Sequence, residues 1–280
     1  AGMVQFDNWL KEGLEAKGYK YESQSSNFDP VTQIEQIENA TAKGTTAIWL
    51  WAVDGKAVHD ACKKAKDSGV IIYSFVQNPG EDAVNMSRGT DETECGKVIA
   101  GLAKDWADEN YGKDAKAGEI KTIVIGNETS ENMRTRFNAT SESIAEDPRF
   151  EVLEVVTTGN STVEGQQATE NMYAKYGDQI DVILTIDGAT VLGVLAYIDS
   201  ESCPEADPAR LGVFATELDT ELADYMKRDL YDGAGINGGN PYNNVCEQIE
   251  ELDQLINGKI DGGFSAVEIG RCTKENLEEY

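Results

Sequence analysis

The stretch LTIDGATVLGVL, residues Leu184–Leu195, changes its hydrophobic period within a few residues. The apolar run VILTI, residues 182–186, predicts a strand that is buried on both faces. Beyond Asp187 and Gly188, the apolar residues of the segment 190–200 recur at helical spacing. Asp187 is therefore expected at the carboxyl end of a strand, directly before a helix, where a lone carboxylate is available either to a ligand or to the helix.

The rest of the chain repeats this unit of apolar strand, polar loop and amphipathic helix. Gly18 follows the first predicted helix, where a left-handed end is needed, and Pro30 stands at the start of the second helix. The predicted helices are 3–17, 30–44, 55–69, 93–112, 130–147, 163–177, 190–200, 220–229 and 242–258. The clearest predicted strands are 19–23, 46–52, 70–76, 121–127, 150–158, 182–186, 211–216 and 264–270.

Strands that alternate with helices predict an α/β fold with parallel sheets and crossover helices. The pattern gives about ten strands, which is large for one open sheet. We therefore expect two doubly wound, Rossmann-like lobes. Ligands of such sheets bind outside the carboxyl ends of the strands, so Asp187 is expected to face a ligand crevice.

The composition excludes several classes of protein. A net charge of −27 repels phosphate backbones, so nucleic acid is not expected as a partner. No apolar run is long enough to cross a bilayer. Five cysteines without a CxxC pair and a single histidine, His59, argue against a zinc site, and we expect neither a metal nor a cofactor. The sequence does not assign a disulfide among the cysteines.

Aromatic, amide and acidic side chains gather at the predicted strand ends. Carboxylates accept hydrogen bonds from hydroxyl groups, amides donate and accept, and rings cover C–H faces. This combination favours a sugar or polyol, although a cationic or nucleoside-like ligand stacked on Trp51 also fits it. The residues at these ends are Trp51, Phe75, Asn78, Asn127, Asp187, Thr216, Glu217, Asn237, Asn240 and Tyr242.

The order of these motifs resembles the type I periplasmic sugar-binding proteins of the ribose-binding kind. The resemblance covers nearly the whole chain. It is carried by the segment 13–51, by SRGTDETECGKVIAGLA at 87–103, by MRTRFNATSESI at 133–144, by TIDGATVLGVL at 185–195, and by NGKIDGG and TKEN near the end. It implies the periplasmic binding protein type I fold, with two lobes joined by a hinge of three chain crossings.

The resemblance also implies a set of ligand-binding residues. The family's hinge-side Asp falls on Asp91, its clamping Arg on Arg136, and the Asn or Asp before the LG helix on Asp187. Arg134 is the nearest alternative to Arg136. The acid after the next strand falls on Glu217, and the polar position of the last crossing falls near Gly239 and Asn240.

Three polar positions of the family are aromatic or apolar here. Its Asn after the third strand falls on Trp51, and its Asp-Arg pair falls on Phe75 and Val76. We therefore expect a ligand other than ribose. With Asn78 added from the strand-end pattern, the predicted ligand-binding set is Trp51, Phe75, Asn78, Asp91, Arg136, Asp187, Glu217 and Asn240.

The implied function is that of an extracytoplasmic substrate-binding protein of an ABC transporter. The N-terminal lobe would hold residues 1–91 and 240–266, and the C-terminal lobe 92–239 and 267–280. A small sugar or polyol would bind between the lobes and close the hinge, and a permease would recognise the closed monomer. The family begins with a central strand that this sequence lacks, so we expect roughly 20–40 further residues before Ala1 in the precursor, by the resemblance.

The predicted site residues also fit plain structural roles. Asp187 and Glu217 fit helix caps, Arg136 fits a surface ion pair, and Trp51 and Phe75 fit an ordinary core. A hydrolase with Asp187 and Glu217 as its paired carboxylates is one alternative function. The second alternative function is the ligand-sensing domain of a repressor or chemoreceptor with the same fold.

Overall fold

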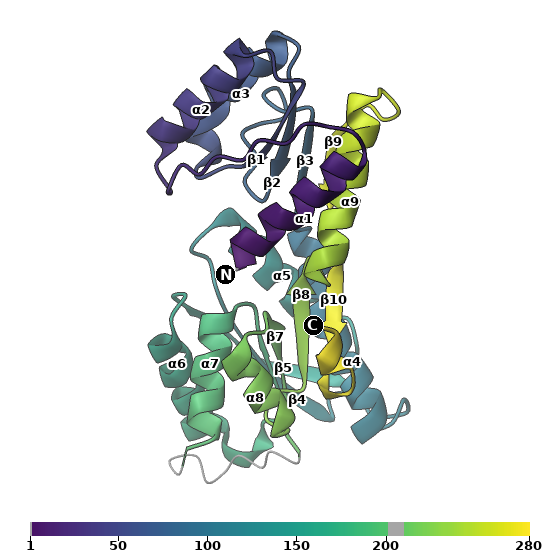
Figure 1. Ribbon diagram of the computed structural model, residues 1–280. Helices are drawn as coiled ribbons and strands as arrows, with labels where there is room; N and C mark the ends of the chain where they lie inside the picture. The colour runs from purple at the N-terminus through teal and green to yellow at the C-terminus, as the bar shows by residue number, and fades with distance from the viewer. Residues whose placement is uncertain (1, 201–209) are drawn as a thin grey trace. The chain divides into compact units, whose positions relative to one another are not determined.

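The computed structural model describes residues 2–200 and 210–280. Contacts within the chain divide it into two compact units. Unit 1 comprises Ala1–Thr90 and Asn240–Glu268, and unit 2 comprises Asp91–Gly239 and Ile269–Tyr280. The chain therefore passes from one unit to the other three times, as the tracing in Figure 1 shows.

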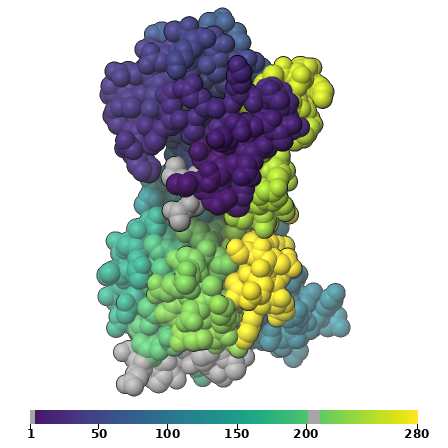
Figure 2. Space-filling model, in the orientation of Figure 1, coloured from purple at the N-terminus to yellow at the C-terminus, as the bar shows by residue number. Residues whose placement is uncertain are grey.

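Unit 1 contains a parallel sheet of four strands in the order β1-β2-β3-β9. The strands are β1 (Ala47–Trp51), β2 (Ile71–Phe75), β3 (Met86–Gly89) and β9 (Gly263–Ala266). Helices α2 (Pro30–Ala42) and α3 (Gly55–Asp67) share one apolar cluster with the sheet. Helices α1 (Gly2–Ala16) and α9 (Pro241–Ile256) share another. Figure 2 shows α1, in dark purple, against α9, in yellow-green, although the two are far apart in the sequence.

Unit 2 contains a six-stranded sheet in the order β10-β8-β7-β6-β4-β5. Its strands are β4 (Ile120–Asn127), β5 (Phe150–Thr158), β6 (Val182–Thr185), β7 (Gly212–Thr216), β8 (Gly233–Asn237) and β10 (Ile269–Cys272). Helices α4 (Glu92–Asn110) and α5 (Glu131–Ala145) cover one face. Helices α6 (Thr162–Tyr176), α7 (Gly188–Ile198) and α8 (Thr220–Lys227) cover the other, and two short 3₁₀ helices are η1 (Gly177–Gln179) and η2 (Lys274–Glu279).

Local signals set the ends of the helices. Asp29 precedes α2, and its carboxylate accepts hydrogen bonds from the first N–H groups of the helix, while Pro30 occupies the first helical position. Gly18 follows α1 with a φ of +93°, which confirms the predicted left-handed end. Such caps satisfy groups that the helix itself cannot pair.

The predicted α/β class with parallel sheets is confirmed, with one exception. The apolar segment FSAVEIG, residues 264–270, was expected to form one strand, and this prediction is wrong. Residues of its first half belong to β9, which is parallel to β3 in unit 1. The second half begins β10, which is antiparallel to β8 in unit 2. Because the chain passes between the units after Glu268, one apolar run supplies two sheets.

The segment YKYES, residues 19–23, was also predicted to be a strand, and it is not one. The alternating tyrosines of this segment do contact the rest of unit 1. Tyr19 donates a hydrogen bond to Asp253, and Tyr21 donates one to Asp7, both at 2.7 Å. These contacts attach the segment to α9 and α1. Among the described residues, however, no strand pairs with its main chain, so the alternating pattern produces an extended segment without a ladder.

Asp232 is a mostly buried carboxyl group directly before β8. Its Oδ2 accepts a hydrogen bond from the Val213 N–H at 2.8 Å. Burial raises the pKa of this carboxyl to about 7, and the neighbouring Asp229 and Glu275 act in the same direction. The folded pKa lies above the unfolded value of about 3.9. The group therefore supports folding fully only below about pH 4, and this support is lost as the pH rises through about 7.

We expect Asp232→Asn to raise the free energy of unfolding at pH 8 by about 2–4 kcal/mol, because the amide keeps an acceptor for Val213 but does not ionise. At pH 4 the variant and the parent should be similar. Urea unfolding at pH 4, 6 and 8 checks this, with the exposed Asp114→Asn as a control. A difference that is the same at all three pH values would contradict the pKa argument.

Candidate functional site

Asp187 lies where the sequence placed it, after β6 and directly before α7, and it is 2% exposed. One carboxylate oxygen accepts the Thr190 N–H at 2.7 Å. The other accepts the Thr190 hydroxyl and the Asn127 side-chain amide, each at 2.9 Å. Asp187 is thus the N-cap of α7, and it also ties the end of β6 to the end of β4.

Arg136 is a buried guanidinium on α5 that reaches the same edge of the sheet. Its Nη1 donates to the main-chain oxygen of Ile186 at 2.9 Å and to the Thr216 hydroxyl at 3.3 Å. Its Nε donates to Glu92 Oε2, and its Nη2 forms an ion pair with the same oxygen, each at 2.7 Å. Arg134, the alternative from the sequence, is exposed. The alternative of a surface ion pair at Arg136 does not hold, because its side chain is only 3% exposed.

Glu217 follows β7, and its carboxylate lies over the start of α7. It accepts a hydrogen bond from the Gly188 N–H, and a Cβ at position 188 would collide with it. Although the residue as a whole is exposed, the carboxylate is partly desolvated, and this raises its pKa. The Arg136 charge opposes the rise, whereas the nearby Asp187 adds to it. Unit 2 therefore gathers Arg136, Asp187 and Glu217 at one edge of its sheet.

In unit 1, Trp51 and Phe75 are paired residues at the carboxyl ends of β1 and β2. Their ring centroids are 5.4 Å apart with an edge-on geometry. Phe6 of α1 stacks on Phe75 at 5.6 Å and contacts Trp51 at 5.9 Å. Phe75 is consequently buried within an aromatic cluster, whereas Trp51 is only partly buried and keeps some ring surface accessible. Of the two, Trp51 is the better platform for a ligand.

The two units share an unusual backbone feature at equivalent places. Val76 follows β2 with a φ of +69°, and Glu217 follows β7 with a φ of +74°. Each donates its N–H to the next strand, Val76 to Arg88 at 2.9 Å and Glu217 to Gly235 at 3.2 Å. A positive φ is rare in non-glycine residues and recurs at functional sites. At these equivalent positions, unit 1 has the exposed side chain of Val76 and unit 2 has the carboxylate of Glu217.

Asn78, Asp91 and Asn240 are exposed residues with local hydrogen bonds to the main chain. Asn78 accepts the N–H of a residue two positions on, at 2.9 Å. Asp91 is the N-cap of α4 and Asn240 is the N-cap of α9. Each therefore has a local structural function, and a ligand contact at these three positions stays a prediction.

Two residues of the unit 2 site were not predicted from the sequence. Glu92 holds Arg136, and Thr190 bonds Asp187 through both its N–H and its hydroxyl. Asn127 is a predicted strand end but is not a member of the predicted ligand-binding set. The one sequence signal for Glu92 was its acidity in the first turn of a helix, which is too common to select it.

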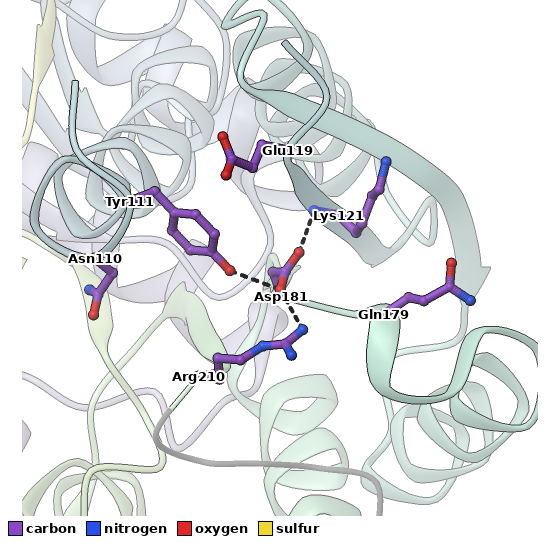
Figure 3. A pocket seen from close by; sticks show the side chains of 7 residues that line it. All are labelled: Asn110, Tyr111, Glu119, Lys121, Gln179, Asp181 and Arg210. Carbon is purple, nitrogen blue, oxygen red and sulfur yellow. Dashed lines mark hydrogen bonds and ion pairs between the residues drawn. The ribbon is translucent and has the colours of Figure 1, made fainter. Parts of the chain in front are cut away.

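A cavity in unit 2 lies at the opposite edge of the sheet, near the amino ends of β4 and β6. It has a volume of about 560 Å³. Asp181 accepts hydrogen bonds there from Tyr111 and the Lys121 N–H at 2.8 Å and from Arg210 at 2.9 Å (Figure 3). Because these groups already bond one another, we assign the cavity a structural function. It is lined by Asn110, Tyr111, Glu119, Lys121, Gln179, Asp181 and Arg210.

Metal, disulfide and membrane features are not seen in the described parts of the chain. Residues 2–200 and 210–280 contain no group of three His, Cys, Asp or Glu side chains that could hold a metal ion. Cys62, Cys95, Cys246 and Cys272 are free thiols, and Cys203 lies outside the described residues. Within the same ranges, no helix is long and apolar enough to cross a membrane.

Two α/β units with parallel sheets and three chain crossings define the periplasmic binding protein type I fold. The sequence matches the periplasmic binding protein domain family over residues 2–260, and the chain belongs to this family. The predicted family resemblance is confirmed by this match.

Individual relatives are distant. The chain is 33% identical over 73 residues to the multiple sugar-binding periplasmic protein SbpA of Azospirillum brasilense, a match that covers 24% of this chain and 20% of SbpA. A sugar-binding protein of a sugar ABC transporter from Bacillus halodurans aligns with a TM-score of 0.79 at 19% identity, over 98% of this chain and 93% of that one. A solute-binding protein from Bacillus halodurans C-125 with bound myo-inositol gives 0.67 at 17%, over 98% and 92%.

Proposed function

We propose that this protein is the extracytoplasmic substrate-binding protein of an ABC transporter and that it binds a small sugar or polyol. The main structural support for this proposal is the group of Arg136, Asp187 and Glu217 at the carboxyl edge of the unit 2 sheet. The names of the relatives support the ligand class, since they include sugar-binding proteins and a structure with bound myo-inositol.

The chemistry of the two units is complementary for such a ligand. In unit 2, carboxylates accept hydrogen bonds from hydroxyl groups, and the guanidinium donates to ring or hydroxyl oxygens. In unit 1, Trp51 offers a ring for a C–H face, and Val76 adds an apolar contact. We propose that one ligand engages both sets. It would then favour a closed state about the three chain crossings, since only that state makes all the contacts.

The proposal includes the partner and the place of action. A permease would bind the closed, ligand-loaded monomer outside the cytoplasmic membrane, and no bond in the ligand would break. The net charge of −27 supports the exclusion of nucleic acid.

A thermal-shift screen tests the function. The panel is D-ribose, D-xylose, L-arabinose, D-glucose, D-galactose and myo-inositol, with adenosine and spermidine as other classes. A ligand at 100 times its dissociation constant adds about 2.7 kcal/mol to the folded state, which raises the melting temperature by a few degrees. Stabilisation by adenosine or spermidine alone would contradict the sugar assignment. Turnover of an oligosaccharide would contradict the binding-only function.

A further inference from the structure

We infer that Glu92 is a positioning residue of the ligand site, which sets the orientation of Arg136 and thereby the affinity for the sugar. This inference rests on the proposed function. Glu92 is the first residue of α4, immediately after the point where the chain first enters unit 2. Its side chain is 11% exposed, and that of Arg136 is 3% exposed.

The hydrogen bonds of Arg136 show what Glu92 contributes. A guanidinium has five N–H groups in a fixed planar fork. The bonds to Glu92, Ile186 and Thr216 use four of them. The fifth, on Nη2, is the donor that remains for a ligand oxygen. Because Nε and Nη2 are both held on one oxygen of Glu92, the plane of the fork, and with it the direction of that fifth N–H, is fixed from the α4 side.

The packing of α4 on α5 makes this contact possible. Gly96 lies one turn after Glu92, and a Cβ there would stand 2.6 Å from the main-chain oxygen of Arg136 and 2.7 Å from Ala139 Cβ. Only glycine permits this approach of the two helices. The short spacing allows a glutamate at the start of α4 to reach a guanidinium that is based on α5.

Charge also favours this arrangement. Arg136 is paired with Glu92, and it lies at the same edge of the sheet as Asp187 and Glu217, where its charge also acts on Glu217. Without Glu92, the guanidinium would be drawn toward the two carboxylates that are expected to accept ligand hydroxyls. Glu92 therefore keeps Arg136 away from a competing ion pair and leaves these carboxylates available to the ligand. A charge-assisted bond of this kind is roughly twice as strong as a neutral one.

The test measures sugar affinity by titration calorimetry, with D-xylose, L-arabinose or myo-inositol as the probe, whichever gives the largest thermal shift. We expect Glu92→Gln to weaken binding about tenfold and Glu92→Ala about a hundredfold, in line with the loss of a charge-assisted contact. Glu94→Gln is the matched control. It removes an exposed carboxylate from the same helical turn and should leave the affinity unchanged.

A double-mutant cycle separates positioning from general stability. In the Arg136→Lys background, which lacks the fork, Glu92→Gln should change the affinity by less than about twofold. Equal losses in both backgrounds would overturn the inference, as would unchanged affinity of Glu92→Gln in the parent background. If the unmodified protein binds none of the probes, the proposed function fails instead, so the two failures are distinguishable.

Discussion

Replacing Arg88 by methionine should lower the free energy of unfolding by about 3 kcal/mol, because a buried ion pair that loses one partner leaves an uncompensated charge. Arg88 on β3 is 4% exposed. Its Nη1 donates to Glu251 at 2.6 Å and to Ser265 at 2.9 Å, and its Nη2 is paired with Glu247. One side chain thus joins β3, α9 and β9.

The network extends beyond the arginine, which is why its loss is costly. Tyr73 on β2 donates its hydroxyl to Glu251, and burial together with this bond raises the pKa of Tyr73. Trp49 on β1 donates to Gln248 of α9 at 2.9 Å. On β9, the Ser265 hydroxyl donates to Glu251 at 2.6 Å. All four strands of the unit 1 sheet therefore anchor α9 through polar side chains, in addition to its apolar face.

Urea unfolding of Arg88→Met checks this expectation. Arg271→Met is the control, because its pair with Asp105 is 41% and 72% exposed and should contribute less than about 1 kcal/mol. Combining Arg88→Met with Glu251→Gln should recover part of the loss, since the stranded charge is removed. A loss for Arg88→Met no larger than that for Arg271→Met would show that the network does not stabilise α9.

Much of the fold could be predicted because its signals are local. The change of period at Asp187, the glycine after α1 and the proline at the start of α2 each act within a few residues. Strand pairing is not local, and both wrong strand predictions have this cause. YKYES alternates correctly but lacks a partner among the described residues, and FSAVEIG gave no sign that the chain changes units within it.

The candidate site likewise has features that local patterns predict and contacts that they do not. The position of Asp187 followed from the strand and helix patterns, whereas its bond to Asn127 spans 60 residues. The pair of Glu92 and Arg136 spans 44 residues and depends on the close approach of two helices at Gly96. An aromatic residue of the first helix likewise joins the cluster at the ends of β1 and β2. Such contacts depend on tertiary packing, which single-sequence patterns do not encode.

Replacing Asp187 by alanine should abolish measurable sugar binding and also destabilise the protein. The stability loss has two parts. Losing the cap of α7 costs about 1 kcal/mol, and leaving the buried Asn127 amide without its acceptor costs a further ~1–3 kcal/mol. Asp219→Ala is the control, because Asp219 caps α8 through a similar bond of 2.8 Å but accepts no side-chain amide of another described residue. The Asp219→Ala variant should lose only the contribution of the helix cap, about 1 kcal/mol.

Asp187→Asn separates binding from folding at this position. The amide keeps the side-chain size and an oxygen for the Thr190 N–H, so the cap of α7 is retained. Its NH2 group replaces the oxygen that accepts from Asn127, so the free energy of unfolding should fall by ~1–3 kcal/mol, which is less than for Asp187→Ala. It removes the charge and one acceptor oxygen, so affinity for the best sugar of the screen should fall roughly 10- to 100-fold, as for a lost charged hydrogen bond. Calorimetric titration well below the unfolding temperature measures this directly. If Asp187→Asn binds as tightly as the parent, then Asp187 is only a helix cap, and the ligand site must be sought elsewhere in the chain.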